Sequence, residues 1–365
     1  MGFRCGIIGL PNVGKSTIFN ALTAAGAEVA NYPFCTIDPN VGILPVPDER
    51  LETIARIINP PKFTHTTMQF VDIAGLVKGA SKGEGLGNKF LGNIRDVEAV
   101  VHIVRCFDDP NVSHVHGTID PKSDIEIINT ELLLADLETV EKRIAKTERM
   151  AKVGDKSVRK ELDVCLKIRD ALGRGIPART VVFDSGDSTQ ILANLHLLTS
   201  KRVLYVANVS ETLLKNGGTY IDEVNKIAGG EGSESIVICG DMEAEIATLP
   251  EGERKDFLED LGLEESGLQK LIRAGYKMLD LITFYTTAGT ELRAWTIKRG
   301  TKASEAAGRI HSDMERGFIK AEALNYNQFE KLGSMVEARE KGLIHIEGRD
   351  YVVNDGDIIY YRFRA

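Results

Sequence analysis

The stretch Gly9-Leu10-Pro11-Asn12-Val13-Gly14-Lys15-Ser16 fits the phosphate-binding pattern G-x-x-x-x-G-K-[ST] and decides the fold. An apolar run at residues 3–9 precedes it, and a helical pattern follows to about Ala25. In such a strand–loop–helix unit, main-chain N–H groups and the positive end of the helix point at phosphates. The lysine reaches the β- and γ-phosphates, and the serine hydroxyl binds Mg²⁺. The sequence therefore predicts a nucleoside triphosphate site that includes Asn12, Val13, Gly14, Lys15, Ser16 and Thr17.

Strand-like apolar runs alternate with helical stretches over much of the chain. The runs lie near residues 41–46, 68–71, 99–106, 202–207 and 235–239. This alternation predicts an α/β fold with a mostly parallel sheet covered by helices on both faces. Residues 122–174 differ, because they contain no strand run and carry apolar residues at helical spacing, with a break near Gly154. They predict an antiparallel helical hairpin inserted between two strands.

The pattern changes again after Leu281, where short strand-like runs lie near residues 283–286, 292–297 and 344–346. Residues 351–354, Asp355-Gly356 and residues 357–363 predict a strand, a turn and a strand. We therefore expect three domains. A P-loop nucleotide-binding domain spans residues 1–121 and 175–281, the helical hairpin spans 122–174, and a small α+β domain spans 282–365.

Two further segments are predicted to complete the phosphate site. Phe70-Val71-Asp72-Ile73-Ala74-Gly75 ends an apolar strand. Its Asp72 can hold Mg²⁺ through a water, and the N–H of Gly75 can face a γ-phosphate. Between this segment and the phosphate-binding loop, Thr36 offers a hydroxyl as the second Mg²⁺ contact, although a plain turn residue is the alternative. Residues 75–92 contain six glycines, which suits a loop that orders with nucleotide.

The segment Asn208-Val209-Ser210-Glu211 stands where a guanine-reading N-K-x-D motif would be expected. Val replaces the Lys and Glu replaces the Asp, so the fork that accepts the two guanine donors is lost. This predicts that ATP is preferred over GTP, with Asn208 on the purine edge and Val209 against the ring. An ordinary strand end is the alternative interpretation.

The activation of water has no obvious agent in the sequence. Leu76 stands where Ras-like enzymes carry a water-orienting Gln, and Leu cannot hydrogen-bond water. His114 and His116 lie in a loop after the strand that ends near Cys106, and a mobile His could position or deprotonate water. A solvated loop histidine is the alternative. A second hypothesis is that Asn12 helps to bind K⁺ near the phosphates, which predicts faster hydrolysis in K⁺ than in Na⁺.

Together, the four motifs at residues 9–17, 32–36, 72–75 and 208–211 resemble those of the YchF-type Obg-like ATPases, in the translation-factor class of P-loop proteins. The resemblance covers essentially the whole chain, since residues 295–321 resemble that family's C-terminal, β-grasp-like TGS domain. It implies an ATPase activity that exceeds the GTPase activity, and association with ribosomes. It also points to His114 as the catalytic residue. Cys35 departs from the wider Obg pattern, where Thr is usual.

Composition excludes several classes of protein. Apolar content of 43% and charged content of 27% are typical of globular proteins, and no run of about 18 apolar residues indicates a membrane span. The N-terminus lacks a secretion signal, and five scattered cysteines without C-x-x-C spacing favour reduced thiols. We expect a monomeric cytoplasmic protein.

The predicted hairpin tip is locally basic in a chain whose net charge is −8. The cations are Lys142, Lys146, Arg149, Lys152, Lys156, Arg159 and Lys160. They could touch RNA phosphates, or they could form an ordinary solvated face interleaved with acidic residues. The terminal domain resembles domains of RNA-associated proteins, so a ribosomal RNA contact through the hairpin and that domain is the prediction.

The favoured function is Mg²⁺-dependent ATP hydrolysis by a positioned water. Two rivals stay open: a GTPase switch, and a ribosome- or RNA-binding module that uses nucleotide mainly as a structural ligand. Leu76 supports the second alternative, because Leu cannot orient a water for hydrolysis. A small-molecule kinase is disfavoured, because no acceptor-pocket or lid signature is visible.

Overall fold

The computed structural model describes residues 3–26, 40–73, 86–114, 117–151, 155–288 and 291–364. Thr36, Gly75 and His116 lie outside these ranges, as does most of the glycine-rich segment after Asp72. The chain divides into two compact units. The larger unit comprises residues 3–42 and 69–275, and the smaller unit comprises residues 1–2, 43–68 and 276–365.

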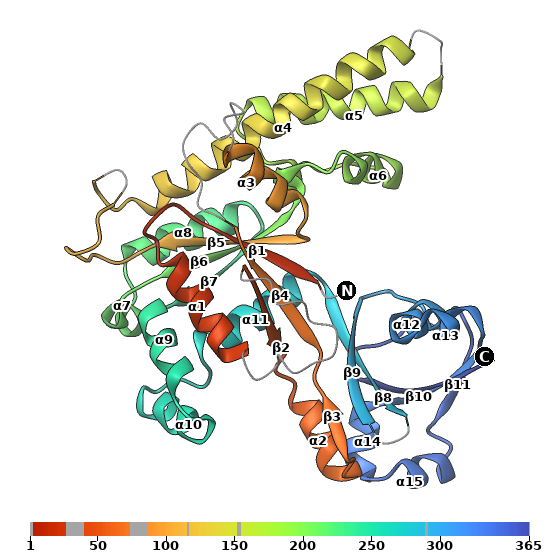
Figure 1. Ribbon diagram of the computed structural model, residues 1–365. Helices are drawn as coiled ribbons and strands as arrows, with labels where there is room; N and C mark the ends of the chain where they lie inside the picture. The colour runs from red at the N-terminus through yellow and green to blue at the C-terminus, as the bar shows by residue number, and fades with distance from the viewer. Residues whose placement is uncertain are drawn as a thin grey trace. The chain divides into compact units, whose positions relative to one another are not determined.

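The first sheet has six strands in the order β2-β4-β1-β5-β6-β7 (Figure 1). The strands are β1 Arg4–Ile8, β2 Val41–Pro45, β4 Thr67–Asp72, β5 Ala99–Arg105, β6 Arg202–Asn208 and β7 Glu234–Ile238. β1 runs parallel to both β4 and β5, and β6 runs parallel to both β5 and β7. All seven residues of β5 are buried, which is typical of a central parallel strand. The predicted α/β fold is confirmed.

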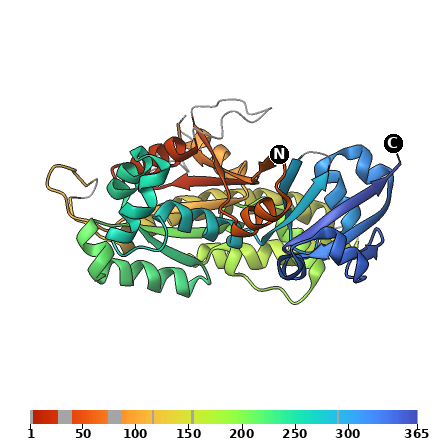
Figure 2. The same ribbon diagram turned by 90° about the horizontal axis from the view of Figure 1, so that it is seen from below.

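Helices cover both faces of this sheet (Figures 1 and 2). α1 packs with α9, while α4 and α8 contact each other and the strands from the other side. The helices of the larger unit, apart from the hairpin, are α1 Lys15–Gly26, α3 Leu86–Arg95, α6 Gly186–Asn194, α7 Glu211–Asn216, α8 Thr219–Gly230, α9 Gly240–Thr248, α10 Glu251–Asp260 and most of α11 Gly267–Met278, with 3₁₀ turns at Ala178–Thr180 and Leu198–Ser200.

In the order of the chain, the predicted helical hairpin follows β5 and precedes β6, as helices α4 Pro121–Ala151 and α5 Lys156–Gly173, which extend away from the sheet (Figure 1). Asp155 caps α5, since its Oδ1 accepts from the N–H of Ser157 at 2.8 Å. Asp136 of α4 joins the hairpin to the sheet body by accepting from the main-chain N–H groups of Leu198 and Thr199 at 2.8 and 2.7 Å. Among the described residues, no helix combines the length and the apolar character needed to cross a bilayer.

The second sheet belongs to the smaller unit and has the order β11-β10-β12-β8-β9-β3. Its elements are β3 Lys62–Thr64, β8 Leu281–Ala288, β9 Glu291–Lys298, β10 Phe318–Asn325, β11 His345–Glu347 and β12 Asp357–Phe363, with helices α2 Glu49–Ile58, α12 Ala303–Ile310, α13 Ser312–Arg316, α14 Tyr326–Leu332 and α15 Met335–Glu340. One apolar cluster packs Phe284 and Ile359 under α12. Another packs Tyr285 and Leu292 against α2 and α14 on the other face.

The predicted strand at residues 351–354 is wrong. Within this segment only Val352 makes a β-bridge, an isolated one to Lys302 in the turn before α12. The main chain of the segment bonds to that turn and not to a neighbouring strand. Tyr351 accepts from the N–H of Ala303 at 2.7 Å, for example. The carboxylate of Asp357 accepts from the hydroxyl of Tyr351 at 2.7 Å, so side chains hold the bend that precedes β12. β12 pairs instead with β10 and β8.

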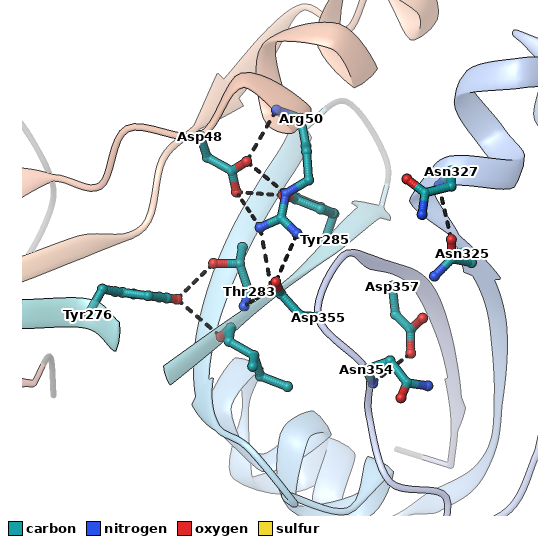
Figure 3. A network of polar contacts seen from close by, with 11 residues as sticks. Asp48, Arg50, Tyr276, Thr283, Tyr285, Asn325, Asn327, Asn354, Asp355 and Asp357 are labelled. Carbon is teal, nitrogen blue, oxygen red and sulfur yellow. Dashed lines mark hydrogen bonds and ion pairs between the residues drawn. The ribbon is translucent and has the colours of Figure 1, made fainter. Parts of the chain in front are cut away.

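A polar network ties the early segment of the smaller unit to its C-terminal strands (Figure 3). Asp48 caps α2 and accepts from the hydroxyl of Tyr285 at 2.5 Å and from Nε of Arg50 at 3.0 Å. Arg50 also pairs with Asp355 at 3.1 Å, and Asp355 accepts from the N–H of Thr283 at 2.9 Å. Burial, and then the charge of Asp48, raise the pKa of Tyr285, so its phenol stays a donor.

A buried histidine sits in the middle of the first sheet. His102 of β5 is 2% exposed, and its ring centroid lies 5.4 Å from that of Tyr205. Tyr205 donates to Glu231 at 2.9 Å, and Glu231 pairs with Arg179 at 2.5 Å. Burial, and then the positive charge of Arg179, lower the pKa of His102 to about 3. The imidazole is therefore neutral at physiological pH.

This depressed pKa predicts a loss of stability in mild acid. Below pH 6.5 the unfolded chain binds a proton at His102 that the folded chain does not, so the free energy of unfolding falls as the pH falls from about 6.5 towards 3. At pH 5 the loss from this residue is about 2 kcal/mol. In His102→Phe, the decrease between pH 7 and pH 5, measured by urea unfolding, should be smaller by that amount. His345→Phe on exposed β11 is the control, and a His102→Phe slope equal to wild type would contradict the assignment.

Candidate nucleotide site

A pocket of about 790 Å³ lies at the carboxyl ends of β1, β5 and β6. Ligands commonly bind at this edge of a parallel sheet. The lining residues are Leu10, Pro11, Asn12, Gly14, Lys15, Ser16, Thr17, Phe107, Asp108, Asp109, Pro110, Val112, Asn208, Val209, Ser210 and Asp241. The pocket thus brings together the predicted phosphate-binding loop and the predicted base-reading segment, although these lie almost 200 residues apart along the chain.

The phosphate-binding loop has a backbone that glycine makes possible. Gly14 has φ = 87°, and a Cβ atom there would come within 2.1 Å of Nδ2 of Asn208. Asn12 is also left-handed, at φ = 63°, a conformation that Asn tolerates better than most residues. Val13 is buried beneath the loop. The carbonyl of Gly14 accepts from the N–H of Ile18 at 3.0 Å, so the loop leads directly into α1.

The ammonium group of Lys15 contacts the carboxylate of Asp72, which ends β4 beside β1. Both side chains are mostly buried, so each charge is compensated by the other. These are the groups that the sequence assigns to the phosphates and to Mg²⁺, and the parallel pairing of β1 and β4 places them together. Ser16 lines the same pocket.

The side chain of Asn208 bridges two loops at the base-reading end. Its Nδ2 donates to the carbonyl of Val13 at 2.9 Å, and its Oδ1 accepts from the N–H of Gly240 at 2.9 Å. An amide has two N–H donors, so one remains for a ligand. Asn208 is 4% exposed and Val209 is 2% exposed. The predicted purine contact would therefore be made by a side chain that already holds the phosphate-binding loop in place.

Glu211 occupies the position of the guanine-reading Asp but does not line the pocket. Its carboxylate pairs with Lys215 at 2.9 Å, one turn further along α7. Asp241, in the first turn of α9, lines the pocket instead. Sequence reasoning missed Asp241, because it follows a strand with no motif to mark it.

The loop after β5 is fixed by a buried arginine that sequence reasoning also missed. Arg105 is 1% exposed, and it donates to the carbonyls of Phe107 and Asp109 at 3.1 and 3.4 Å. Its guanidinium carbon lies 4.7 Å from the centroid of the Phe107 ring. Phe107 and Asp109 therefore reach the pocket from an anchored segment. A charged residue at the end of an otherwise apolar strand run was the available signal.

His114 does not line the pocket. Its Nε2 lies 3.0 Å from Oδ2 of Asp124, in the first turn of α4, and both side chains are almost fully buried. The neighbouring Ser113 accepts from Nδ2 of Asn12 at 3.1 Å, so this loop also contacts the phosphate-binding loop. In this structure His114 is held against α4 and is not a solvated loop residue.

A metal ion in this pocket would depend on the nucleotide for most of its ligands. In the ranges that the structure describes, no three His, Cys, Asp or Glu side chains cluster so that they could hold a metal. Ser16 and Asp72 supply oxygen atoms of the kind Mg²⁺ prefers, and Mg²⁺ usually keeps waters and phosphate oxygens as further ligands. The residues present therefore fit a Mg²⁺ ion that arrives with a triphosphate.

Comparison with known proteins gives matches over the whole chain. A family model described as a 50S ribosome-binding GTPase matches residues 4–147, and a YchF C-terminal model, described as a protein of unknown function, matches residues 281–364. The ribosome-binding ATPase YchF of Bacillus subtilis is 53% identical and that of Escherichia coli O157:H7 is 50% identical, each over 100% of both chains. The structure of the Schizosaccharomyces pombe YchF GTPase aligns with a TM-score of 0.90 at 35% identity, covering 99% of this chain and 98% of that one.

The Asn208 bridge predicts a structural effect that does not need nucleotide. Asn208→Ala leaves the carbonyl of Val13 and the N–H of Gly240 without their partner, which should lower the free energy of unfolding by about 2–3 kcal/mol. Urea unfolding of nucleotide-free protein measures this. Asn225→Ala, on the exposed surface of α8, is the matched control and should change stability by less than about 0.5 kcal/mol. Equal effects of the two substitutions would refute the bridging role.

Proposed function

This chain belongs to the YchF family, as its motifs indicate, and on that premise we propose that it binds ATP in preference to GTP and hydrolyses it with Mg²⁺. The main support is the pocket itself, which gathers Lys15, Ser16 and Asn208 around one cavity, with Asp72 paired to the lysine. The relatives at 50–53% identity are named ribosome-binding ATPases. We extend that activity to this chain.

The preference for adenine rests on what lines the base end of the pocket. Phe107 and Val209 offer apolar contact to a purine ring. The remaining N–H of Asn208 can donate to a ring nitrogen. The carboxylate at the guanine-reading position, Glu211, does not line the pocket and is paired with Lys215. Asp241 favours the second candidate, a GTPase, because its carboxylate could accept from both guanine donors, N1–H and N2–H₂, whereas the adenine amine offers it one donor group.

The phosphate end supports hydrolysis by positioning and charge. Lys15 would leave Asp72 to bind the β- and γ-phosphates, while Ser16, with Thr36, would hold Mg²⁺. A bound Mg²⁺ neutralises charge that develops on the phosphate oxygens. We propose His114 as the group that orients or deprotonates the attacking water. It must leave Asp124 to do so, and the anchored Ser113–Asn12 contact keeps its loop next to the phosphate-binding loop.

We propose that the chain acts as a cytoplasmic ribosome-associated factor and that the hairpin contributes an RNA contact. Lys142 and Lys160 are paired with Glu138 and Asp187. Four further cations have no ion pair among the described residues: Lys146, Arg149, Lys156 and Arg159. These remain available for phosphates, and their contribution would weaken with salt. We also keep the hypotheses of a K⁺ ion near Asn12 and of a monomer.

The base preference is tested by calorimetric titration of Mg²⁺-ATP and Mg²⁺-GTP. ATP should bind at least about tenfold more tightly, as expected for the loss of one paired guanine contact. Glu211→Ala should leave both affinities within about twofold, because Glu211 lies outside the pocket lining. Tighter binding of GTP, or a selective loss of GTP affinity in Glu211→Ala, would replace the ATP proposal with the GTPase.

The role of His114 is tested by separating turnover from binding. His114→Ala should lower kcat by about 10²-fold, the scale of general acid–base catalysis, with the Kd for ATP within about twofold of wild type. Phosphate release and titration measure the two quantities. His345→Ala, exposed on β11, is the control. An unchanged kcat in His114→Ala would remove the residue from the mechanism.

A further inference from the structure

The sheet of the smaller unit carries a polar and aromatic surface that the nucleotide site does not explain. Pairing of β10 with β11 and β12 sets Ile346, Glu322 and Tyr360 in one row across the three strands, and Lys320 and Arg362 in the next. Successive residues of a strand face opposite sides of the sheet, so these five share one face. Arg339 of α15 reaches the same face and pairs with Glu322 at 3.1 Å. We call these six residues the β10–β12 patch.

The patch is the uncovered half of a face that is otherwise packed. Further along the same strands, Leu324 and Ile358 are 1% exposed beneath α2, α14 and α15. The neighbouring Ile346 and Tyr360, in contrast, are 68% and 40% exposed among the described residues. The buried Ala321 and Tyr361 alternate with the patch residues and belong to the core under α12 on the other face. Exposed apolar and aromatic side chains therefore stand on strands that are paired in the sheet.

The patch carries surplus positive charge in an acidic chain. The carboxylate of Glu322 is largely buried, at 12% exposure, and it lies within 3.1–3.5 Å of the cationic nitrogens of Lys320, Arg339 and Arg362. One carboxylate thus holds three cations in place and neutralises only one of them. The chain as a whole has a net charge of −8, so this positive charge is a local feature of the patch. A polyanion would complete their pairing.

The aromatic ring in the patch is prepared for stacking. The guanidinium carbon of Arg362 lies 4.5 Å from the centroid of the Tyr360 ring, a cation–π contact that orients the ring. Planar rings and guanidinium groups stack on unpaired bases, and sheets with exposed aromatics serve as platforms for single-stranded RNA. A duplex hides its bases within the stack and would use only the cations.

We propose that the β10–β12 patch binds single-stranded RNA, with phosphates on Lys320, Arg339 and Arg362 and an unpaired base stacked at Tyr360. The proposal rests on the proposed ribosome association for its biological setting, and it names one surface through which that association would occur. It is physically independent of ATP binding, because none of the six residues lines the nucleotide pocket.

Fluorescence anisotropy with the full-length protein and a labelled twelve-nucleotide oligouridylate tests the proposal. Tyr360→Ala should weaken binding by about 5- to 150-fold, the range of one base–aromatic stack, whereas Tyr360→Phe should bind as wild type does. Lys320→Ala should reduce the slope of log K against log salt by about one unit. Phe63→Ala, another exposed aromatic of the smaller unit, is the matched control, and its affinity should not change. Thermal melts confirm that each variant is folded.

Three outcomes would overturn the proposal. The wild-type protein could fail to bind the oligouridylate, or Tyr360→Ala could bind it as tightly as wild type does. Tyr360→Ala could also lose as much affinity for an RNA duplex as it loses for the single strand. Polyglutamate that binds as tightly as the RNA would reveal a general anion surface instead. The ATPase rate and Kd for ATP of Tyr360→Ala should match wild type. Loss of RNA binding with normal ATP turnover supports the patch, while normal RNA binding without ATP binding would sink the proposed ATPase and leave the patch standing.

Discussion

The buried amide of Asn208 is the contact on which the nucleotide pocket depends. It joins the end of β6 to the carbonyl of Val13 in the phosphate-binding loop and to the N–H of Gly240 at the start of α9. A Cβ atom at position 14 would come within 2.1 Å of Nδ2, so the amide can take this place because residue 14 is glycine. The wrapped loop, the pairing of Lys15 with Asp72 and the base end of the pocket are therefore parts of one packed assembly.

A second level of organisation lies in buried carboxylates, each of which joins two separate elements of the chain. Asp136 joins the hairpin to the 3₁₀ turn at Leu198–Ser200, and Glu243 accepts from the N–H groups of Gly267 and Leu268 at the start of α11. Asp48 caps α2 and accepts from the hydroxyl of Tyr285 in β8. In each case a carboxylate satisfies main-chain or phenolic donors that would otherwise be buried unpaired. Burial raises the pKa of Asp136 and Glu243, and the donated hydrogen bonds oppose that rise.

Much of the fold could be predicted from the sequence, because local patterns carried the information. The phosphate-binding motif, the alternating strands and the helical hairpin all follow from spacing within short windows. The strand predicted at residues 351–354 failed because side-chain bonds from Asp357 and pairing with the turn before α12 decide that segment. Asp241 escaped prediction because only the folded chain brings it beside the phosphate-binding loop. Arg105 and His114 have partners within ten residues along the chain, but no motif marks a polar side chain that is buried against its own loop or the next helix.

The edge strand β3 has a consequence for the order in which the smaller unit assembles during synthesis. Thr64 of β3 bonds to Glu291 of β9, its neighbour in the sheet, which lies 227 residues later in the chain. At roughly 5–20 residues per second of elongation, β3 and α2 wait about ten to forty-five seconds before β9 has been made. Throughout that interval the apolar face of α2, with Leu51 and Ile54, has no partner from the C-terminal strands. The nascent chain therefore carries an unfinished domain after the phosphate-binding loop and first helix have already been made. During this time a chaperone or a protease would have access to the segment that contains α2 and β3.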